Sequence, residues 1–201
     1  MELDEVRAFF DRLAPRWDEW QDLTPPIAGE ILTAAGIRPG TTVLDVGCGT
    51  GVLFPYYLER NVRKVVAVDL SPQMIRLAAE KKPDPRIELV CGDIQTLPVR
   101  CRCDAAVLFN CYPHFADPEG LFEALAKWLC PGGRLTVAHN LSLERLNAHH
   151  AQEADSVSHC AVTAQGIREL LQTRFRVDLL LERDDIFCIS GTLLPEAEPR
   201  K

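Results

Sequence analysis

Short apolar runs alternate with amphipathic stretches along most of this chain. The apolar runs are rich in β-branched residues, end at or beside a Gly, Asp, Asn or His, and lie at 42–47, 64–70, 86–93, 103–110 and 133–139. Short runs bounded in this way indicate strands. Between them, helical patterns cover 51–61, 71–82 and 118–130. Continuously apolar strands that alternate with helices predict an α/β fold, in which a parallel sheet is covered by helices on both faces.

Particular residues mark the ends of two of these helices. Ser71 followed by Pro72 is a typical start, because serine caps free backbone N–H groups and proline fits the first turn. The helix over 118–130 runs into a Pro-Gly-Gly sequence at 131–133. This sequence predicts that the helix ends there and that the next strand follows.

The pattern changes at both ends of the chain. Residues 175–194 form two longer strand patterns joined at 183–185, which predicts an antiparallel hairpin on one edge of the sheet. We predict one domain over 1–195 and a loose tail over 196–201. Within the domain, residues 1–40 form an N-terminal helical extension and residues 140–170 a variable insert.

Composition and charge narrow the choice of partners. The chain has 201 residues, of which 47% are hydrophobic and 25% charged, and its net charge is −7. A negative protein repels polyanions on average, so we expect no nucleic-acid partner. We expect no membrane partner either, because no apolar run approaches the ~20 residues of a membrane span. The N-terminus lacks the pattern of a secretory signal, which favours a cytoplasmic protein.

The eight cysteines fit this expectation. Thiols stay reduced in a cytoplasm, and several of these lie in apolar runs, where cysteine packs as a small hydrophobe. Cys101 and Cys103 form a C-x-C sequence instead of the C-x-x-C pairs of a zinc site. We therefore predict no metal centre from the cysteines.

The sequence VLDVGCGTG at 43–51 is the strongest chemical signal. Ligands of open α/β sheets bind beyond the carboxyl ends of strands, and a glycine-rich turn there lets backbone N–H groups approach a polar ligand. A phosphate-binding P-loop is excluded because no Gly-Lys-Ser/Thr follows. A dinucleotide fingerprint fits poorly, because the third glycine lies at 51 and not at 52.

The remaining pattern, D-x-G-x-G-x-G, resembles the loop of class I S-adenosylmethionine (SAM)-dependent methyltransferases. Further family features follow in order: an acid at Asp69 after the second strand, CGDIQTLP at 91–98, and the segment 110–135 with its Pro-Gly-Gly return. Residues 9–20 resemble the N-terminal helix of ubiquinone/menaquinone-biosynthesis-type methyltransferases. The resemblance implies a Rossmann-like, seven-stranded, mostly parallel sheet of order 3-2-1-4-5-7-6 with its last strand antiparallel.

The resemblance also implies a role for each residue of a SAM site. Asp45 would neutralise the α-ammonium of SAM, and Asp69 would accept both ribose hydroxyls. Met74 would lie against the adenine, whose amino group would donate to Asp93 while the Ile94 backbone contacts the ring. Trp17 would cap the cofactor from the N-terminal helix. The implied SAM-contacting residues are Trp17, Asp45, Gly47, Cys48, Gly49, Gly51, Asp69, Leu70, Met74, Asp93, Ile94 and Asn110.

Histidines gather where a methyl acceptor would bind. His114 follows the fourth strand and His139 ends the fifth, and each is a candidate general base because histidine titrates near pH 7. Tyr112, His149 and His150 are candidate acceptor contacts, the last two on a helix predicted over 139–150. Both catalytic candidates have a structural alternative as packing residues. A metal site is disfavoured because adjacent histidines on a helix point about 100° apart.

These observations predict a SAM-dependent methyltransferase that acts on a small-molecule acceptor. The acceptor atom, which is N, O, C or S, and the oligomeric state stay open. One alternative is a non-catalytic SAM- or metal-binding regulatory module, since a fold is not an activity. A second is a nicotinamide-dependent oxidoreductase, against which the position of the third glycine argues.

Overall fold

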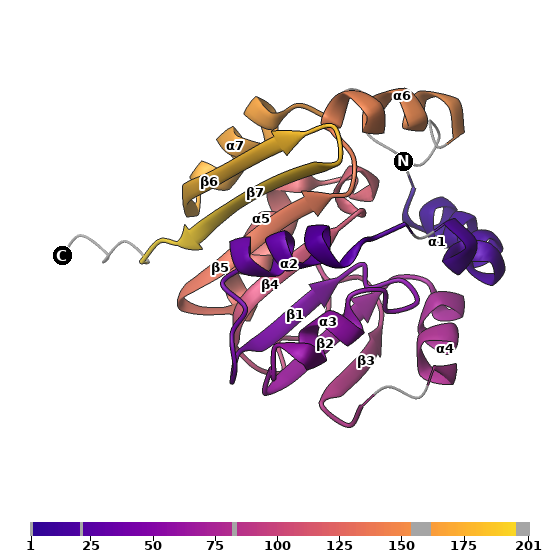
Figure 1. Cartoon of the computed structure of the whole chain (residues 1–201), viewed down its shortest axis with the longest axis horizontal. Helices are drawn as coiled ribbons and strands as arrows, with labels where there is room; N and C mark the ends of the chain where they lie inside the picture. The colour runs from indigo at the N-terminus through magenta and orange to yellow at the C-terminus, as the bar shows by residue number, and fades with distance from the viewer. Residues whose placement is uncertain (1, 21, 82–83, 154–161, 196–201) are drawn as a thin grey trace.

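The computed structural model describes residues 2–20, 22–81, 84–153 and 162–195, without the side chains of 149–153. The described residues form one seven-stranded sheet of order β3-β2-β1-β4-β5-β7-β6 (Figure 1). β7 runs antiparallel to both of its neighbours, and the other pairs are parallel. The strands are β1 (Thr42–Val46), β2 (Lys64–Asp69), β3 (Ile87–Cys91), β4 (Cys103–Phe109), β5 (Leu129–His139), β6 (Phe175–Arg183) and β7 (Ile186–Leu193). The predicted sheet order and antiparallel strand are confirmed.

Helices cover both faces of this sheet. They are α1 (Leu3–Leu13), η1 (Ala14–Trp20), α2 (Pro25–Ala34), α3 (Phe54–Glu59), α4 (Pro72–Glu80), η2 (Tyr112–His114), α5 (Pro118–Trp128), α6 (Leu143–Glu153) and α7 (Ala164–Gln172). One core cluster lies between the sheet and α5, α6 and α7, and a second between the sheet and α2, α3 and α4. Side chains alternate across each strand, so Val43 joins the second cluster and Leu44 the first.

Two helix boundaries differ from the prediction. The helix expected over 118–130 ends at Trp128, because Leu129 already has an extended backbone and pairs with Cys103 across β4 and β5. The Pro-Gly-Gly sequence therefore lies within β5 and does not end the helix, so that prediction was wrong. The helix expected over 51–61 begins only at Phe54, because the glycine loop continues as a turn up to that point. At the start of α4, the predicted Ser71 cap is confirmed: its hydroxyl accepts from Met74 N at 3.1 Å.

Candidate cofactor and active site

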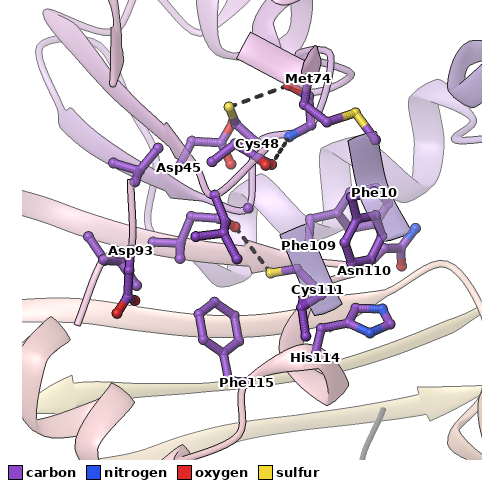
Figure 2. Close-up of a pocket in the computed structure, with 18 of the residues that line it drawn as sticks. Phe10, Asp45, Cys48, Met74, Asp93, Phe109, Asn110, Cys111, His114 and Phe115 are labelled. Carbon is purple, nitrogen blue, oxygen red and sulfur yellow. Dashed lines mark hydrogen bonds between the residues drawn. The ribbon is translucent and has the colours of Figure 1, made fainter. Parts of the chain in front are cut away.

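A pocket opens at the carboxyl ends of β1, β2, β3 and β4, beneath α1 and η1 (Figure 2). The structure brings together at its walls all the predicted SAM-contacting residues except Gly51. Those that line it are Trp17, Asp45, Gly47, Cys48, Gly49, Asp69, Leu70, Met74, Asp93, Ile94 and Asn110. Their distance from one another in the sequence, from Trp17 to Asn110, shows that the sheet topology assembles the site.

The glycine loop is tight because neighbouring side chains crowd it. Gly47 has φ +63°, and a Cβ added there would lie 2.7 Å from Cys111 Cβ. Gly51 has φ +89°, and its added Cβ would lie 2.3 Å from the Phe54 ring, so this glycine shapes the loop without lining the pocket. Only glycine combines such backbone angles with such close approaches.

Asp69 connects the glycine loop to the end of β2. Its carboxylate accepts from Gly49 N and from Ser71 N, both at 2.8 Å. Burial raises the pKa of Asp69 to about 6, against the two backbone donors, and the nearby Asp11 carboxylate adds to the rise. Part of the side chain stays open to the pocket, and each carboxylate oxygen has a further lone pair for a ligand hydroxyl.

Asp45 lies inside β1 and is almost fully buried, with 2% of its surface exposed. Burial raises its pKa to about 7; the neighbouring Tyr57 hydroxyl opposes this rise, and the Asp69 carboxylate adds to it. Its Oδ2 atom has no hydrogen-bond partner among the described residues, although the side chain lines the pocket. A buried acceptor without a partner is costly unless a ligand satisfies it. Asp45 therefore fits a cationic hydrogen-bond donor in the pocket.

α1 and η1 cover the pocket, and together with Asp22 we call them the N-terminal cover. Hydrogen bonds to the carboxylates of its aspartates attach this cover to the rest of the domain. α1 packs beside α4 (Figure 1). Val6, Phe10 and Trp17 line the pocket. Three aspartates of this N-terminal cover accept hydrogen bonds from three loops at the carboxyl edge of the sheet and from the end of α4. The pairs are Asp11 with Ser71, Asp18 with Thr50 and Lys81, and Asp22 with Asn140.

The predicted acceptor residues separate in the structure. His114 lines the pocket from η2, and its ring meets the Phe10 ring edge-on at 4.8 Å (Figure 2). His139 is buried at the end of β5 and does not line this pocket. Tyr112 does not line it either: its ring stacks on Phe122 at 5.8 Å, and burial raises its pKa to about 12.

The remaining histidine predictions have no structural outcome. The side chains of His149 and His150 lie outside the described residues. On the same helix, Asn147 is tied to the Val162 backbone by hydrogen bonds of 2.8 and 2.9 Å. No group of three or more metal-ligating side chains occurs in the described part of the chain. In that part, the helices are also too short or too polar to cross a membrane.

Sequence reasoning missed some residues of the site. Phe10 and Cys111 line the pocket but were not predicted to. Both lie inside segments that carry the family resemblance, at 9–20 and 110–135. Their place in these segments was the signal that could have identified them as pocket residues. Cys111 is held by its thiol, which donates to Val46 O at 3.1 Å beneath the glycine loop. Its place below Gly47 depends on the packing of β4 against β1.

Comparisons with known proteins agree with this geometry. Residues 44–137 match a family model described as a methyltransferase domain. A demethylmenaquinone methyltransferase of Renibacterium salmoninarum is 32% identical over 141 residues, which cover 67% of this chain and 58% of the relative. Residues 44–137 thus belong to a methyltransferase domain family. A malonyl-[acyl-carrier protein] O-methyltransferase of Priestia megaterium is 28% identical over 63% of this chain and 47% of the relative. The chain thus spans about half the length of these relatives.

Solved structures share the fold of this methyltransferase-family domain. A chain from the complex of the Haloferax volcanii Trm112 methyltransferase activator with a methyltransferase has a TM-score of 0.81 at 20% identity, covering 92% of this chain and 98% of that one. The N-methyltransferase NodS of Bradyrhizobium japonicum, bound to S-adenosyl-L-homocysteine, has a TM-score of 0.75 at 16% identity, covering 94% and 98%. The [4+2]-cyclase SpnF has a TM-score of 0.74 at 17% identity, covering 90% and 76%. The fold therefore carries more than one chemistry.

Proposed function

We propose that this domain binds SAM in the pocket and transfers its methyl group to a small-molecule acceptor. The observation that carries the proposal is the buried Asp45 Oδ2 atom, which has no hydrogen-bond partner among the described residues and lines the pocket together with Asp69. A cationic group held by one carboxylate and a pair of hydroxyls held by the other would match the amino-acid part and the ribose of SAM. The names of the relatives, which include demethylmenaquinone and malonyl-[acyl-carrier protein] O-methyltransferases, support a small or carrier-bound acceptor.

Different residues of the pocket would bind different parts of SAM. Asp45 would hold the ammonium group and Asp69 the ribose hydroxyls, while the adenine would lie between Leu70, Met74 and Ile94 and donate to Asp93. Bound SAM supplies a methyl group already activated on a sulfonium, so the protein has mainly to align the acceptor and remove its proton. The N-terminal cover, through Trp17 and Phe10, would exclude water as a lid.

We assign proton removal to His114 and not to His139, because only His114 lines the pocket. Its contact with Phe10 places the imidazole at the boundary between the pocket and the N-terminal cover. A histidine at this place is suited to take a proton near neutral pH from an acceptor that enters beneath the cover.

The proposal is tested by incubating the protein with methyl-labelled SAM and fractions of a small-molecule extract. We expect label to enter an acceptor, and we expect His114→Ala to lower turnover at least tenfold while the Kd for SAM stays within threefold. A His139→Ala variant is the matched control and should keep its turnover. SAM binding without any labelled product would favour the regulatory module, and binding of NAD instead of SAM would favour an oxidoreductase.

Titration of Asp45 predicts how SAM affinity depends on pH. In the free protein this carboxyl, with its pKa of about 7, holds a proton below that pH. A cationic ligand favours the ionised form, so binding should expel a proton, and affinity should rise as pH increases from 6 to 7.5. Isothermal titration in two buffers of different ionisation enthalpy at pH 6.5 measures the released proton. Asp45→Asn should remove most of this release.

The same pKa makes a prediction for folding stability. The folded pKa of about 7 lies above the unfolded value of about 3.9, so the folded state binds the proton more tightly. This contribution is fully present below pH 4 and is lost as pH rises through 7, and Asp45→Asn should flatten the decline. Asp84→Asn is the control, because Arg86 lowers the pKa of Asp84 to about 2, which is outside this window. An equal decline in both variants would contradict the assignment.

A further inference from the structure

A second cavity lies at the opposite edge of the sheet, where β1, β2, β3 and β4 begin. We call it the basic groove, and it is lined by Thr42, Arg63, Lys64, Pro85, Arg86, Cys101 and Arg102. Four of these residues carry a positive charge on a chain whose net charge is −7. The SAM-site residues lie at the other ends of the same strands, so the groove is separate from the candidate active site.

Carboxylates only partly balance the charge of the basic groove. Among the described residues, Glu88 pairs with Lys64 at 2.6 Å and with Arg100 at 3.4 Å. Asp84 pairs with Arg86 at 2.9 Å, and Asp104 lies 3.8 Å from Arg63 while also accepting from Thr42 N. Arg102 donates to a neutral acceptor, the Leu129 carbonyl, at 3.0 Å. These five cations face three carboxylates, which leaves a local positive charge for an anion.

A pair of thiols adjoins these cations. Cys101 forms part of the groove wall and is half-buried, whereas Cys103 is fully buried. Cys103 belongs to the core cluster beneath the sheet, and Cys101 packs against that cluster. The Lys64 ammonium is close enough to interact with both thiols. The cations of the groove attract a negatively charged disulfide toward the partly exposed Cys101. The thiolate form of a cysteine is the nucleophile in exchange with disulfides.

We propose that Cys101 is a thiolation site for small disulfides that carry carboxylates. The Cys101 thiolate attacks one sulfur of the disulfide, so a Cys101–sulfur bond forms and the disulfide bond breaks. The other half leaves as a thiolate and takes up the proton that Cys101 released. The disulfide is thereby reduced to one thiol, and Cys101 is oxidised to a mixed disulfide.

The neighbouring Cys103 decides how long this product lasts. Burial raises the pKa of the Cys103 thiol, as do the charges of Cys101 and Cys130. It therefore stays protonated near pH 7 and attacks the mixed disulfide slowly. The adduct on Cys101 is accordingly the product that accumulates, in preference to a Cys101–Cys103 disulfide.

Cys91 offers an internal comparison with the opposite charge. It is exposed at the carboxyl end of β3, so it is more accessible than Cys101. Burial and the carboxylates of Asp69 and Asp11 raise its pKa, and Arg7 opposes them. If exposure decides reactivity, Cys91 reacts first with every disulfide. If charge decides it, anionic disulfides select Cys101.

The experiment compares two disulfides on the unmodified full chain. Glutathione disulfide is anionic and cystamine is cationic, and peptide mass mapping over time gives the rate at each cysteine. With glutathione disulfide we expect Cys101 to react at least tenfold faster than Cys91. With cystamine we expect this ratio to fall at least tenfold, and 0.5 M salt should bring the two ratios together because it screens the charges.

Variants locate the effect without touching the SAM pocket. Arg63→Gln and Lys64→Gln should each slow the glutathione reaction at Cys101 at least threefold and leave Cys91 within twofold, and Cys101→Ser should remove the adduct while Cys91 still reacts. A Cys101-to-Cys91 ratio that is the same for both disulfides, or faster reaction of Cys91 with glutathione disulfide, would overturn the proposal. Because the main comparison uses the unmodified chain, the result does not depend on how a variant folds, and it does not depend on SAM binding.

Discussion

Replacing Asp69 with alanine is expected to weaken SAM binding by at least 100-fold. The proposed site gives this carboxylate two ribose hydroxyls, and hydrogen bonds to a charged group contribute about 1.5–3 kcal/mol each. Together they amount to roughly 3–6 kcal/mol, which corresponds to a loss of about two to four orders of magnitude. The substitution also releases Gly49 N, whose hydrogen bond to Asp69 holds the glycine loop. Isothermal titration with SAM measures the change.

Controls separate binding from folding in this test. Asp69→Asn keeps one oxygen acceptor, so we expect an intermediate loss of affinity. Asp84→Ala, at an aspartate that pairs with Arg86 and does not line the pocket, should bind SAM like the wild type. Unfolding in urea is followed in the absence of SAM, because leaving two backbone donors without a partner destabilises the Asp69→Ala protein by itself. An Asp69→Ala protein that is folded and binds SAM within threefold of wild type would show that the ribose lies elsewhere.

The second large effect is expected from Gly51→Ala, which should both destabilise the fold and abolish SAM binding. At φ +89° a side chain costs about 1–2 kcal/mol. The new methyl group would also lie 2.3 Å from the Phe54 ring, and overpacking of this kind adds about 1–3 kcal/mol. The free energy of unfolding should fall by about 2–5 kcal/mol, and the glycine loop, which we propose contacts the cofactor, should move.

Gly40→Ala is a matched control for the cost of placing a side chain at a positive φ angle. Gly40 has φ +85°, close to that of Gly51, but nothing lies within 4 Å of an added Cβ. Its substitution should cost only about 1–2 kcal/mol and leave SAM affinity unchanged. The difference between the two variants in urea unfolding isolates the contact with Phe54. Equal destabilisation by both substitutions would mean that the ring moves aside and that backbone strain alone makes Gly51 necessary.

Much of the fold and part of the site could be predicted from local sequence. The strand positions, the start of α4 at Ser71 and the terminal hairpin follow from hydrophobic period, capping and turn residues. The glycine loop is similarly local, because positive φ angles at Gly47, Gly49 and Gly51 require that residue type. The sheet order and the assignment of pocket residues came from the family resemblance, which carried positions far apart in sequence into one site.

The sequence by itself thus determined which elements form and which residues stand at the ends of the strands, because these depend on neighbouring residues. Only the tertiary structure decided that α5 stops at Trp128, where pairing of Leu129 with Cys103 overrides the local helical pattern. Only it separated His114, in the pocket, from His139, which is buried outside it. It likewise placed Cys101 among cations that begin other strands. Strand pairing, burial and charge environment join residues far apart along the chain, so no local pattern records them.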